Sequence, residues 1–401
     1  MKKILFVIPH MLAGGVETAL LALLSQMDRK KYDISVLLVE QEGELLSQLP
    51  NDISVGRLPI TETLSNEILH GKNTSSFVKK AVKSGNILLA SQILYRKIIN
   101  KDPLAKYSVP FSKVNALAEK YDAAICFHAH CPFVLKYVAE KVQSKKKFLW
   151  IHNDFKSTNF EINHYYKQLQ VYDNIYCVSD QVRKEFLEIV PKASEKTSIF
   201  HNIIPKERII NYADEYYPPE YSKQCGIPII LSIGRLNHQK GFDVAVRVSQ
   251  RLIDCGIEHC WYILGDGEDR EKLQALIQAQ SLNNTFILLG TRENPYPYIK
   301  NCNLYVQPSR HEGYGIAVAE ARILEKPIIC TNFAGAHEQI VNDINGLIVE
   351  FDEQQIFDAI KMVLSDRSRQ ERMAESLHQE NQNAKCNSEL RGFLDLIDEI
   401  S

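Results

Sequence analysis

The chain has 401 residues, of which 45% are hydrophobic and 24% are charged, and its formal net charge is −2. These values are typical of folded proteins and exclude a disordered, fibrous or general nucleic-acid-binding chain. The length favours two domains of ordinary size. No apolar run approaches the roughly 18–20 residues that span a bilayer, so no membrane span is expected. The nine cysteines are scattered and odd in number, which favours reduced thiols in the cytoplasm.

Charge is unevenly distributed along the chain. Residues 1–205 carry 27 Lys and Arg against 20 Asp and Glu, whereas residues 206–401 carry 20 against 29. Halves of opposite sign indicate two domains that face different partners.

The first half begins like a doubly wound α/β domain. Residues 3–8 are continuously apolar, as in a buried parallel strand, and Gly14 and Gly15 precede a helical pattern that starts at Val16. With a second strand at 32–40, these elements form a βαβ unit. Pro9 and His10 interrupt the first apolar stretch, so we expect no cleaved signal peptide. Three further strands are expected at 123–127, 147–151 and 174–178.

Segment 61–113 is unusually basic, with nine Lys and Arg against three Asp and Glu. Basic and apolar residues alternate there at helical spacing. Two interpretations remain open: a solvated helix face, or a basic amphipathic helix that lies on an anionic membrane surface or binds a lipid-linked acceptor.

The same order of elements restarts after a polar interdomain stretch at 211–223. Strands are expected at 227–234, 260–265, 286–290, 304–308 and 327–331, and helical patterns lie between them. Two doubly wound halves predict a ligand cleft between them, because such sheets bind ligands beyond the carboxyl ends of their strands.

The most informative motif is SRHEGYGIAVAEARILEKPIICT at 309–331. Gly313 and Gly315 permit close approach of a ligand to the backbone, and the following helix directs its N–H groups there. Glu312 precedes this anion site. Glu320 lies in an apolar helical pattern, which is costly unless it binds hydroxyls or a cation. The alternative is an ordinary helix start with a surface glutamate.

A second motif, LSIGRLNHQKGFD at 231–243, places Arg235 and Lys240 between the end of a strand and the start of a helix. Two cations in that position can hold a diphosphate. Two solvated loop charges are the alternative.

Together these motifs resemble glycosyltransferase family 4. The resemblance covers roughly residues 228–350 through GRLNHQKGFD, LGDGEDREKL, NPYPYIKNCNLYVQPSRHEGYGIAVAEA and GAHEQIVNDINGLIV, with a weaker match at PHMLAGGVET. Members are retaining nucleotide-sugar transferases with the GT-B fold, in which two Rossmann-like doubly wound domains face each other across a cleft. The resemblance implies an acceptor domain at 1–205, a donor domain at 206–385 and a C-terminal helix at 386–401 that crosses back to the first domain.

The family's glutamate pair, separated by seven residues, corresponds to Glu312 and Glu320. By resemblance, Glu312 binds the donor sugar and Glu320 the ribose hydroxyls, while Arg235 and Lys240 hold the pyrophosphate. The remaining candidate donor-binding residues are Gly14, Gly15, Arg292, Gly313, Tyr314 and Gly315. We assign Asp266 to a turn and helix cap, and Glu338 to a favourable charge at a helix start.

Histidines supply the remaining candidates. His152 follows a buried strand and matches a position where related enzymes place a histidine near the reacting sugar, with Asp154 beside it. His128 and His130 are acceptor-side candidates, because strand alternation sends them to one face together with Cys126. The CxHxHC spacing matches no standard zinc site, and we expect no metal.

We therefore expect a retaining transferase that moves a hexose-type sugar from a UDP- or GDP-sugar to a hydroxyl of a saccharide or lipid-linked saccharide, in surface-polysaccharide synthesis. Charge that grows on the leaving phosphate is stabilised by the two cations and the helix, so no cofactor or metal is expected. The expected location is the cytoplasm, at the inner face of the membrane. A sugar-nucleotide epimerase and a non-catalytic partner of another transferase remain alternatives.

Overall fold

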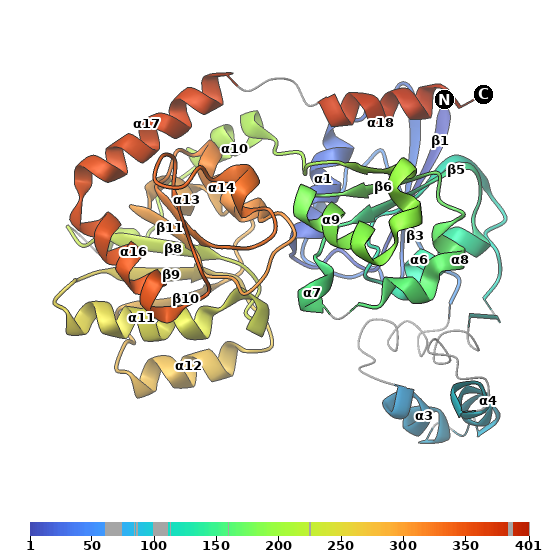
Figure 1. The fold of residues 1–401 in the computed structure, drawn as a ribbon, viewed down its shortest axis with the longest axis horizontal. Helices are drawn as coiled ribbons and strands as arrows, with labels where there is room; N and C mark the ends of the chain where they lie inside the picture. Colours follow the sequence, from blue (N-terminus) through green and yellow to red (C-terminus); the bar gives the residue numbers. More distant parts are fainter. Residues whose placement is uncertain are drawn as a thin grey trace.

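The computed structural model describes residues 1–60, 74–83, 85, 87–98, 111–112, 114–158, 160–223, 226–383 and 388–400. Two parallel sheets lie side by side, each covered by helices (Figure 1). The first sheet has the order β3-β2-β1-β4-β5-β6-β7 and the second the order β10-β9-β8-β11-β12-β13. The doubly wound α/β class expected from the sequence is therefore confirmed.

The first sheet is built from residues before 200. Its strands are β1 (Lys2–Ile8), β2 (Tyr32–Leu38), β3 (Ser54–Arg57), β4 (Lys120–Cys126), β5 (Gln143–Ile151), β6 (Asn174–Cys177) and β7 (Thr197–Ile199). The helices of this part are α1 (Gly15–Gln26), α3 (Thr74–Lys83), α4 (Ile87–Ile98), α6 (Pro132–Lys141), α7 (Phe155–Thr158), α8 (Tyr166–Leu169) and α9 (Asp180–Ile189).

The second sheet follows the same pattern. Its strands are β8 (Ile229–Ile233), β9 (Cys260–Leu264), β10 (Phe286–Gly290), β11 (Leu304–Gln307), β12 (Ile328–Thr331) and β13 (Leu347–Val349). The helices are α10 (Lys206–Ala213), α11 (Phe242–Asp254), α12 (Arg270–Ala279), α13 (Tyr296–Asn301), α14 (Ile316–Ile323), α15 (Ala336–Gln339), α16 (Glu353–Ser365), α17 (Arg367–Asn383) and α18 (Ser388–Asp398).

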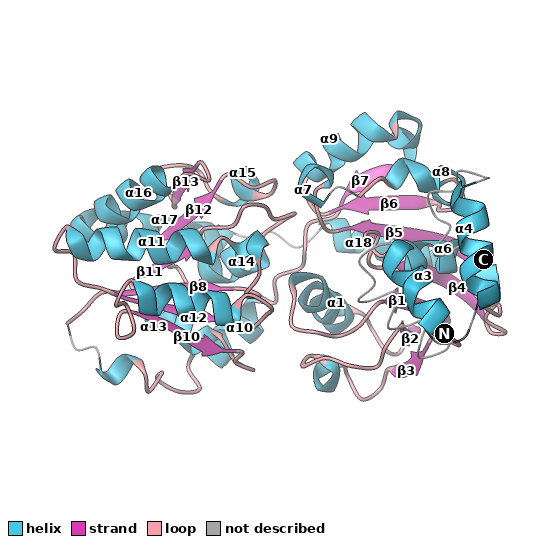
Figure 2. Cartoon of the chain, turned by 90° about the horizontal axis from the view of Figure 1, so that it is seen from below, coloured by secondary structure: helices cyan, strands magenta, loops and turns pink. Residues whose placement is uncertain are grey.

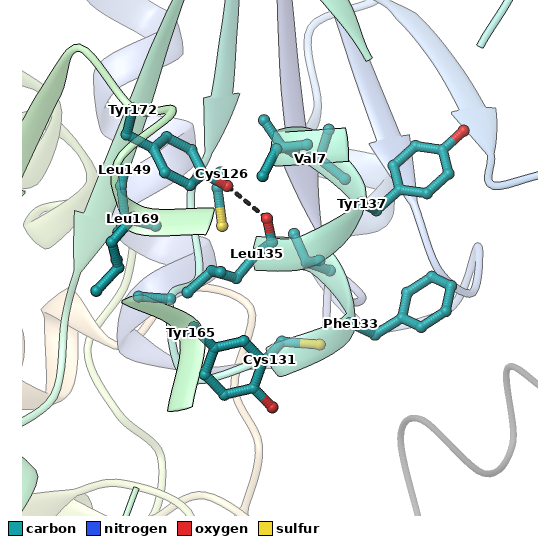
Figure 3. Close-up of a cluster of buried hydrophobic side chains, with 14 of the residues drawn as sticks. Val7, Cys126, Cys131, Phe133, Leu135, Tyr137, Leu149, Tyr165, Leu169 and Tyr172 are labelled. Carbon is teal, nitrogen blue, oxygen red and sulfur yellow. Dashed lines mark hydrogen bonds between the residues drawn. The ribbon is translucent and has the colours of Figure 1, made fainter. Parts of the chain in front are cut away.

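Each sheet separates two apolar cores, which explains the continuously apolar central strands. Along β1, Leu5 and Val7 enter one core while Phe6 and Ile8 enter the other, because successive side chains point to opposite faces. Helices accordingly lie on both faces of each sheet (Figure 2). Figure 3 shows the first of these cores, where the buried Tyr172 hydroxyl donates to the carbonyl of Leu135 over 2.6 Å.

The C-terminal segment contacts both halves of the molecule. Helix α17 packs on α14 and α16, and α18 then covers the first sheet (Figure 1). Phe393 of α18 meets Trp150 edge to face, with ring centroids 5.0 Å apart. Tyr32 donates a hydrogen bond to Asp398 over 2.8 Å. The first sheet therefore acquires part of its core from the end of the chain.

Much of the basic segment 61–113 lies outside the described residues. Its described part includes α3 and α4, which pack on each other around the buried Ile93, apart from the main sheet layers in Figure 1. Lys79 and Lys83 are exposed on α3. The large apolar side chains exposed on this pair of helices are Val82, Ile87, Leu88, Leu94, Tyr95 and Ile98.

Candidate active site

Strand order places a cleft between the two sheets. In each sheet the order reverses at a central strand, β1 in the first and β8 in the second, and ligands bind beyond the carboxyl ends of strands at such points. The loops after these strands line one cleft of about 830 Å³, together with the loop after β11 and the start of α14. This volume lies within the range of about 300–1,000 Å³ that holds small-molecule ligands.

Arg235 and Lys240, the two cations predicted to hold a diphosphate, both line this cleft. Lys240 ends a 3₁₀ turn that Asn237 caps, and its Nζ forms an ion pair with Glu312 Oε1. Ser309 Oγ donates to the same carboxylate oxygen over 2.9 Å. Arg235 reaches across to the first domain, where its guanidinium is 3.5 Å from the carbonyl of Ala13. The two cations therefore lie where the domains face each other.

Gly234 makes room for Lys240. A Cβ atom at Gly234 would lie 2.8 Å from Lys240 Cε, so a side chain there would displace the lysine from its ion pair. Gly234, which follows β8, therefore helps to position the Lys240 ammonium group.

The Gly313-Tyr314-Gly315 turn brings the domains into contact. A Cβ at Gly313 would lie 1.8 Å from the carbonyl oxygen of His152, so only glycine permits this approach. Gly315 has φ +88° and caps α14, a left-handed conformation that favours glycine. The carbonyl of Tyr314 accepts a hydrogen bond from Gln339. The start of α14 is thereby fixed at the cleft.

Glu320 is a buried carboxylate on the wall of the cleft, with only 7% of its surface exposed. Tyr296 donates a hydrogen bond to its Oε1 over 3.2 Å. Burial raises the pKa of Glu320 to about 7, and the Tyr296 bond and the more distant Arg208 partly oppose that rise. A carboxylate in this state gains from any ligand that donates hydroxyl hydrogens to it.

His128 and His152 line the cleft from the first domain. His152 is 7% exposed and its ring lies 4.7 Å from that of Phe127. Burial lowers the pKa of both histidines, so both rings are neutral near pH 7. His128 Nδ1 and His152 Nε2 are buried and have no hydrogen-bond partner in the part of the chain that the structure describes.

His130 and Asp154 do not line the cleft. His130 lies between Phe155 and Phe160, at centroid distances of 5.1 and 4.9 Å. Strand alternation fails here because β4 ends at Cys126, so the chain is no longer extended at His130. The structure therefore separates His130 and Asp154 from the other candidates.

Arg292 lines the cleft but is already paired. Its Nε donates to the Tyr298 hydroxyl over 3.1 Å, and its terminal nitrogen is 3.0 Å from Glu220. Asp266 also faces the cleft and accepts from the backbone of Gly267. The helix-capping role expected for Asp266 is wrong, since α12 is preceded by Asp269 at the N-cap position.

Several residues that line the cleft were not predicted from the sequence. His10 lies two residues after the end of β1, close to the type of position that singled out His152 after β5, and this could have identified it. Its Nδ1 lies 3.1 Å from Oε1 of the buried Glu17. Asn202 and Arg208 also line the cleft, but nothing in their local sequence marks them.

Among the described residues, no group of three or more His, Cys, Asp or Glu side chains is arranged to hold a metal ion. The helices in the same ranges are all too short or too polar to cross a bilayer.

Residues 217–379 match the family described as Glycosyl transferases group 1. An uncharacterized glycosyltransferase of Methanocaldococcus jannaschii is 30% identical over 53% of this chain and 55% of its own length. A Campylobacter jejuni protein named N-acetylgalactosamine-N,N'-diacetylbacillosaminyl-diphospho-undecaprenol 4-alpha-N-acetylgalactosaminyltransferase is 34% identical over 34% of this chain and 37% of its own. The chain thus spans about half or less of these curated relatives.

Structural similarity extends further than sequence similarity. Anabaena HepE, solved in complex with UDP and glucose, superposes with a TM-score of 0.71 over 100% of both chains at 16% identity. The match of the C-terminal half and the two-sheet architecture of the whole agree with the expected resemblance. Residues 217–379 thus match the group 1 glycosyl transferases, in agreement with the resemblance to glycosyltransferase family 4, and the chain as a whole has the GT-B fold.

Proposed function

We propose that this chain is a retaining glycosyltransferase that moves a hexose-type sugar from a UDP- or GDP-sugar to a hydroxyl of a saccharide or lipid-linked saccharide. One observation carries the proposal: Arg235, Lys240 and the N-terminus of α14 converge on the cleft that also contains Glu312 and Glu320. Departure of a nucleoside diphosphate leaves negative charge on its outer phosphate. Fixed cations and helix N–H groups stabilise that charge without having to reorganise.

The two glutamates take different roles in this scheme. Glu320 lies deep and keeps a raised pKa, which suits a carboxylate that receives ribose hydroxyls. Glu312 contacts Lys240 and so lies beside the phosphates, where the donor sugar begins. His152, whose backbone touches Gly313, approaches the same point from the other domain. The donor sugar would then lie between the two domains.

The relatives support the substrate classes. HepE was solved with UDP and glucose, which supports a nucleotide-sugar donor here. The Campylobacter jejuni relative is named for transfer to a diphospho-undecaprenol-linked saccharide. We accordingly favour surface-polysaccharide synthesis at the cytoplasmic face of the membrane as the setting.

Helices α3 and α4, the described helices of segment 61–113, provide a surface for that setting. Lys79 and Lys83 of α3 are exposed next to Val82, and α4 exposes further apolar side chains. Positive charge combined with exposed apolar area is the composition that binds anionic lipid surfaces. We therefore include peripheral membrane binding through this segment in the proposal.

In this scheme Arg235 and Lys240 supply the positive charge that a metal ion provides in other transferases, so transfer is expected to be independent of metal and of any cofactor. Unchanged activity in EDTA is the expected result. Loss of activity that added Mg²⁺ or Mn²⁺ restores would contradict this part of the proposal.

The test is acceptor-dependent release of a nucleoside diphosphate. UDP- and GDP-sugars are incubated with the protein, with and without a lipid-linked saccharide fraction, and the product linkage is read by NMR. Retention of the donor's anomeric configuration is expected, and Glu312→Gln should lower turnover about 10²-fold or more. Glu375→Gln, an exposed site on α17, is the control. Nucleotide release that needs no acceptor would favour an epimerase, and donor binding without turnover would favour a partner module.

A further inference from the structure

The two walls of the cleft differ in charge, because the part of the chain after residue 205 lines it with both cations and carboxylates, whereas the described part before residue 205 supplies carboxylates alone. Among the described lining residues, each Lys and Arg comes from the part of the chain after residue 205, and these are Arg208, Arg235, Lys240 and Arg292. The lining residues between positions 10 and 202 include two carboxylates, Glu17 and Glu44, and no Lys or Arg. This wall is acidic even though residues 1–205 are basic as a whole.

Glu17 is the buried carboxylate of this wall. It lies in the first turn of α1 with 3% of its surface exposed, and its Oε1 is 3.1 Å from His10 Nδ1. A Cβ at Gly14 would lie 2.5 Å from Glu17 Oε2 and 3.5 Å from the Arg235 guanidinium. The glycine therefore leaves space for the carboxylate directly opposite one of the donor-side cations.

The contact with Glu17 orients the His10 ring. A carboxylate only accepts hydrogen bonds, so a ring proton lies on Nδ1 towards Glu17, and Nε2 accepts when the ring carries no second proton. His10 Nδ1 is also 3.4 Å from the Leu12 backbone N–H, but the carboxylate is closer and charged. A hydroxyl group that enters the cleft can donate to His10 Nε2.

The other histidines of the wall add no positive charge. Burial lowers the pKa of His128 and of His152, and the neighbouring histidines lower that of His152 further. His152 is more than nine-tenths buried, yet its Nε2 has no hydrogen-bond partner among the described residues. A buried polar atom without a partner gains from a ligand that supplies one.

In the acceptor subsite expected on this half of the molecule, we infer that His10 and Glu17 bind the hydroxyls of the receiving sugar and that this sugar is uncharged or bears an amino group. A phosphate or carboxylate on the receiving ring would lie against Glu17 and Glu44, and the described residues of this wall include no Lys or Arg to pair with it. Any phosphates of a lipid carrier would remain outside this subsite. The inference rests on the proposed function, because it assumes a donor on the opposite wall.

The test compares three probes that differ in charge: the 4-nitrophenyl glycosides of glucose, of glucosamine with a free amine, and of glucuronic acid. Their dissociation constants are measured by ligand-observed NMR with a saturating nucleoside diphosphate. The glucuronide is expected to bind about tenfold or more weakly than the glucoside, as like-charge juxtaposition disfavours binding. In Glu17→Gln the glucuronide should bind only about threefold more weakly than the glucoside. In His10→Gln the affinity for the glucoside should fall.

Controls separate failure of this inference from failure of the proposed function. Glu161→Gln removes a charge from an exposed site of the same half outside the cleft and should leave the discrimination unchanged. Binding of the nucleotide by Glu17→Gln verifies that this variant is folded. Equal binding of glucuronide and glucoside, unchanged discrimination in Glu17→Gln, or no binding of any probe to the nucleotide-bound protein would overturn the inference. Lack of nucleotide binding by the wild type would instead overturn the proposed function.

Discussion

His201 Nε2 lies 2.6 Å from Glu338 Oε2, and this contact joins the end of the first sheet to the second domain. The other ring nitrogen is 2.9 Å from Glu389, at the start of α18. Both carboxylates accept, so a ring that donates to both must be an imidazolium. The second oxygen of Glu338 accepts from the backbone N–H of Asp180 over 2.8 Å. Glu338, expected only to favour a helix start, therefore links three segments.

This link should depend on pH. The hydrogen bond to Glu338 raises the pKa of His201 above its ordinary 6.5, and the bond to Glu389 adds to this, while burial opposes it. A raised pKa means that the stabilisation is fully present below pH 6.5 and is lost as pH rises through the folded value. The neighbouring Tyr314 ring stays neutral, because burial raises its pKa to about 12.

The melting temperature of the wild type is therefore expected to exceed that of His201→Gln by a few degrees at pH 6. The difference should shrink towards zero by pH 9, as measured by differential scanning fluorimetry. Equal melting curves at pH 6, or a gap that grows with pH, would show that the contact stabilises nothing.

Nucleotide affinity should also depend on pH because of Glu320, and it should rise as the pH rises. Its pKa of about 7 lies above the ordinary 4.5, so the carboxylate becomes ionised only as pH rises through neutrality. Ionised Glu320 accepts hydroxyl hydrogens, and the affinity for a nucleoside diphosphate should rise between pH 6 and pH 8.

Glu320→Gln should remove that rise and weaken binding about tenfold at pH 8, the effect expected for hydrogen bonds to a charged group. The measurement is a calorimetric titration of the wild type and of Glu320→Gln with the nucleoside diphosphate at pH 6 and at pH 8. A pH-independent affinity in the wild type would place the ribose elsewhere.

The contact between Gly313 and His152 makes a sharp steric prediction. In Gly313→Ala the new Cβ would overlap the His152 carbonyl oxygen, and the domains would have to separate locally. We expect turnover to fall about 10²-fold, the cost that a small displacement of reacting groups can produce, while the fold is retained. Gly392→Ala, where a Cβ meets nothing within 4 Å, is the matched control and should retain full activity.

Neutralising Lys79, Lys80 and Lys83 to glutamine should weaken binding to phosphatidylserine vesicles about 100-fold. This corresponds to about 1 kcal/mol for each basic residue near an anionic surface. The control replaces three exposed lysines elsewhere in the same half, Lys30, Lys120 and Lys167. Co-sedimentation that is equal for both triple variants would remove segment 61–113 from the proposal.

The sequence predicted the fold class because the central strands are buried on both faces. β1 is continuously apolar from Ile4 to Ile8, and β8 is apolar apart from the buried Ser232, a pattern that few other structures allow. The edge strands β3, β7 and β13 were not predicted, since they have only three or four residues and β3 exposes most of its side chains.

Site residues were predictable where a local pattern placed them. The motif around Glu312 and Glu320 and the loop with Arg235 and Lys240 all line the cleft, because each follows a strand or starts a helix. The pairing of His10 with Glu17, and of His201 with Glu338, depends on side chains that meet only after folding. No periodicity marks such pairs.

The central claim is that Arg235 and Lys240 hold a pyrophosphate, and its most direct test is a binding screen of UDP, GDP, ADP and CMP. One nucleoside diphosphate is expected to bind the wild type and to lose about 2–4 kcal/mol of binding free energy in Lys240→Ala, since that variant leaves Glu312 without its ion pair. Lys272→Ala, an exposed site outside the cleft, should bind like the wild type. If no nucleotide binds, or if Lys240→Ala binds equally well, the pyrophosphate site is wrong.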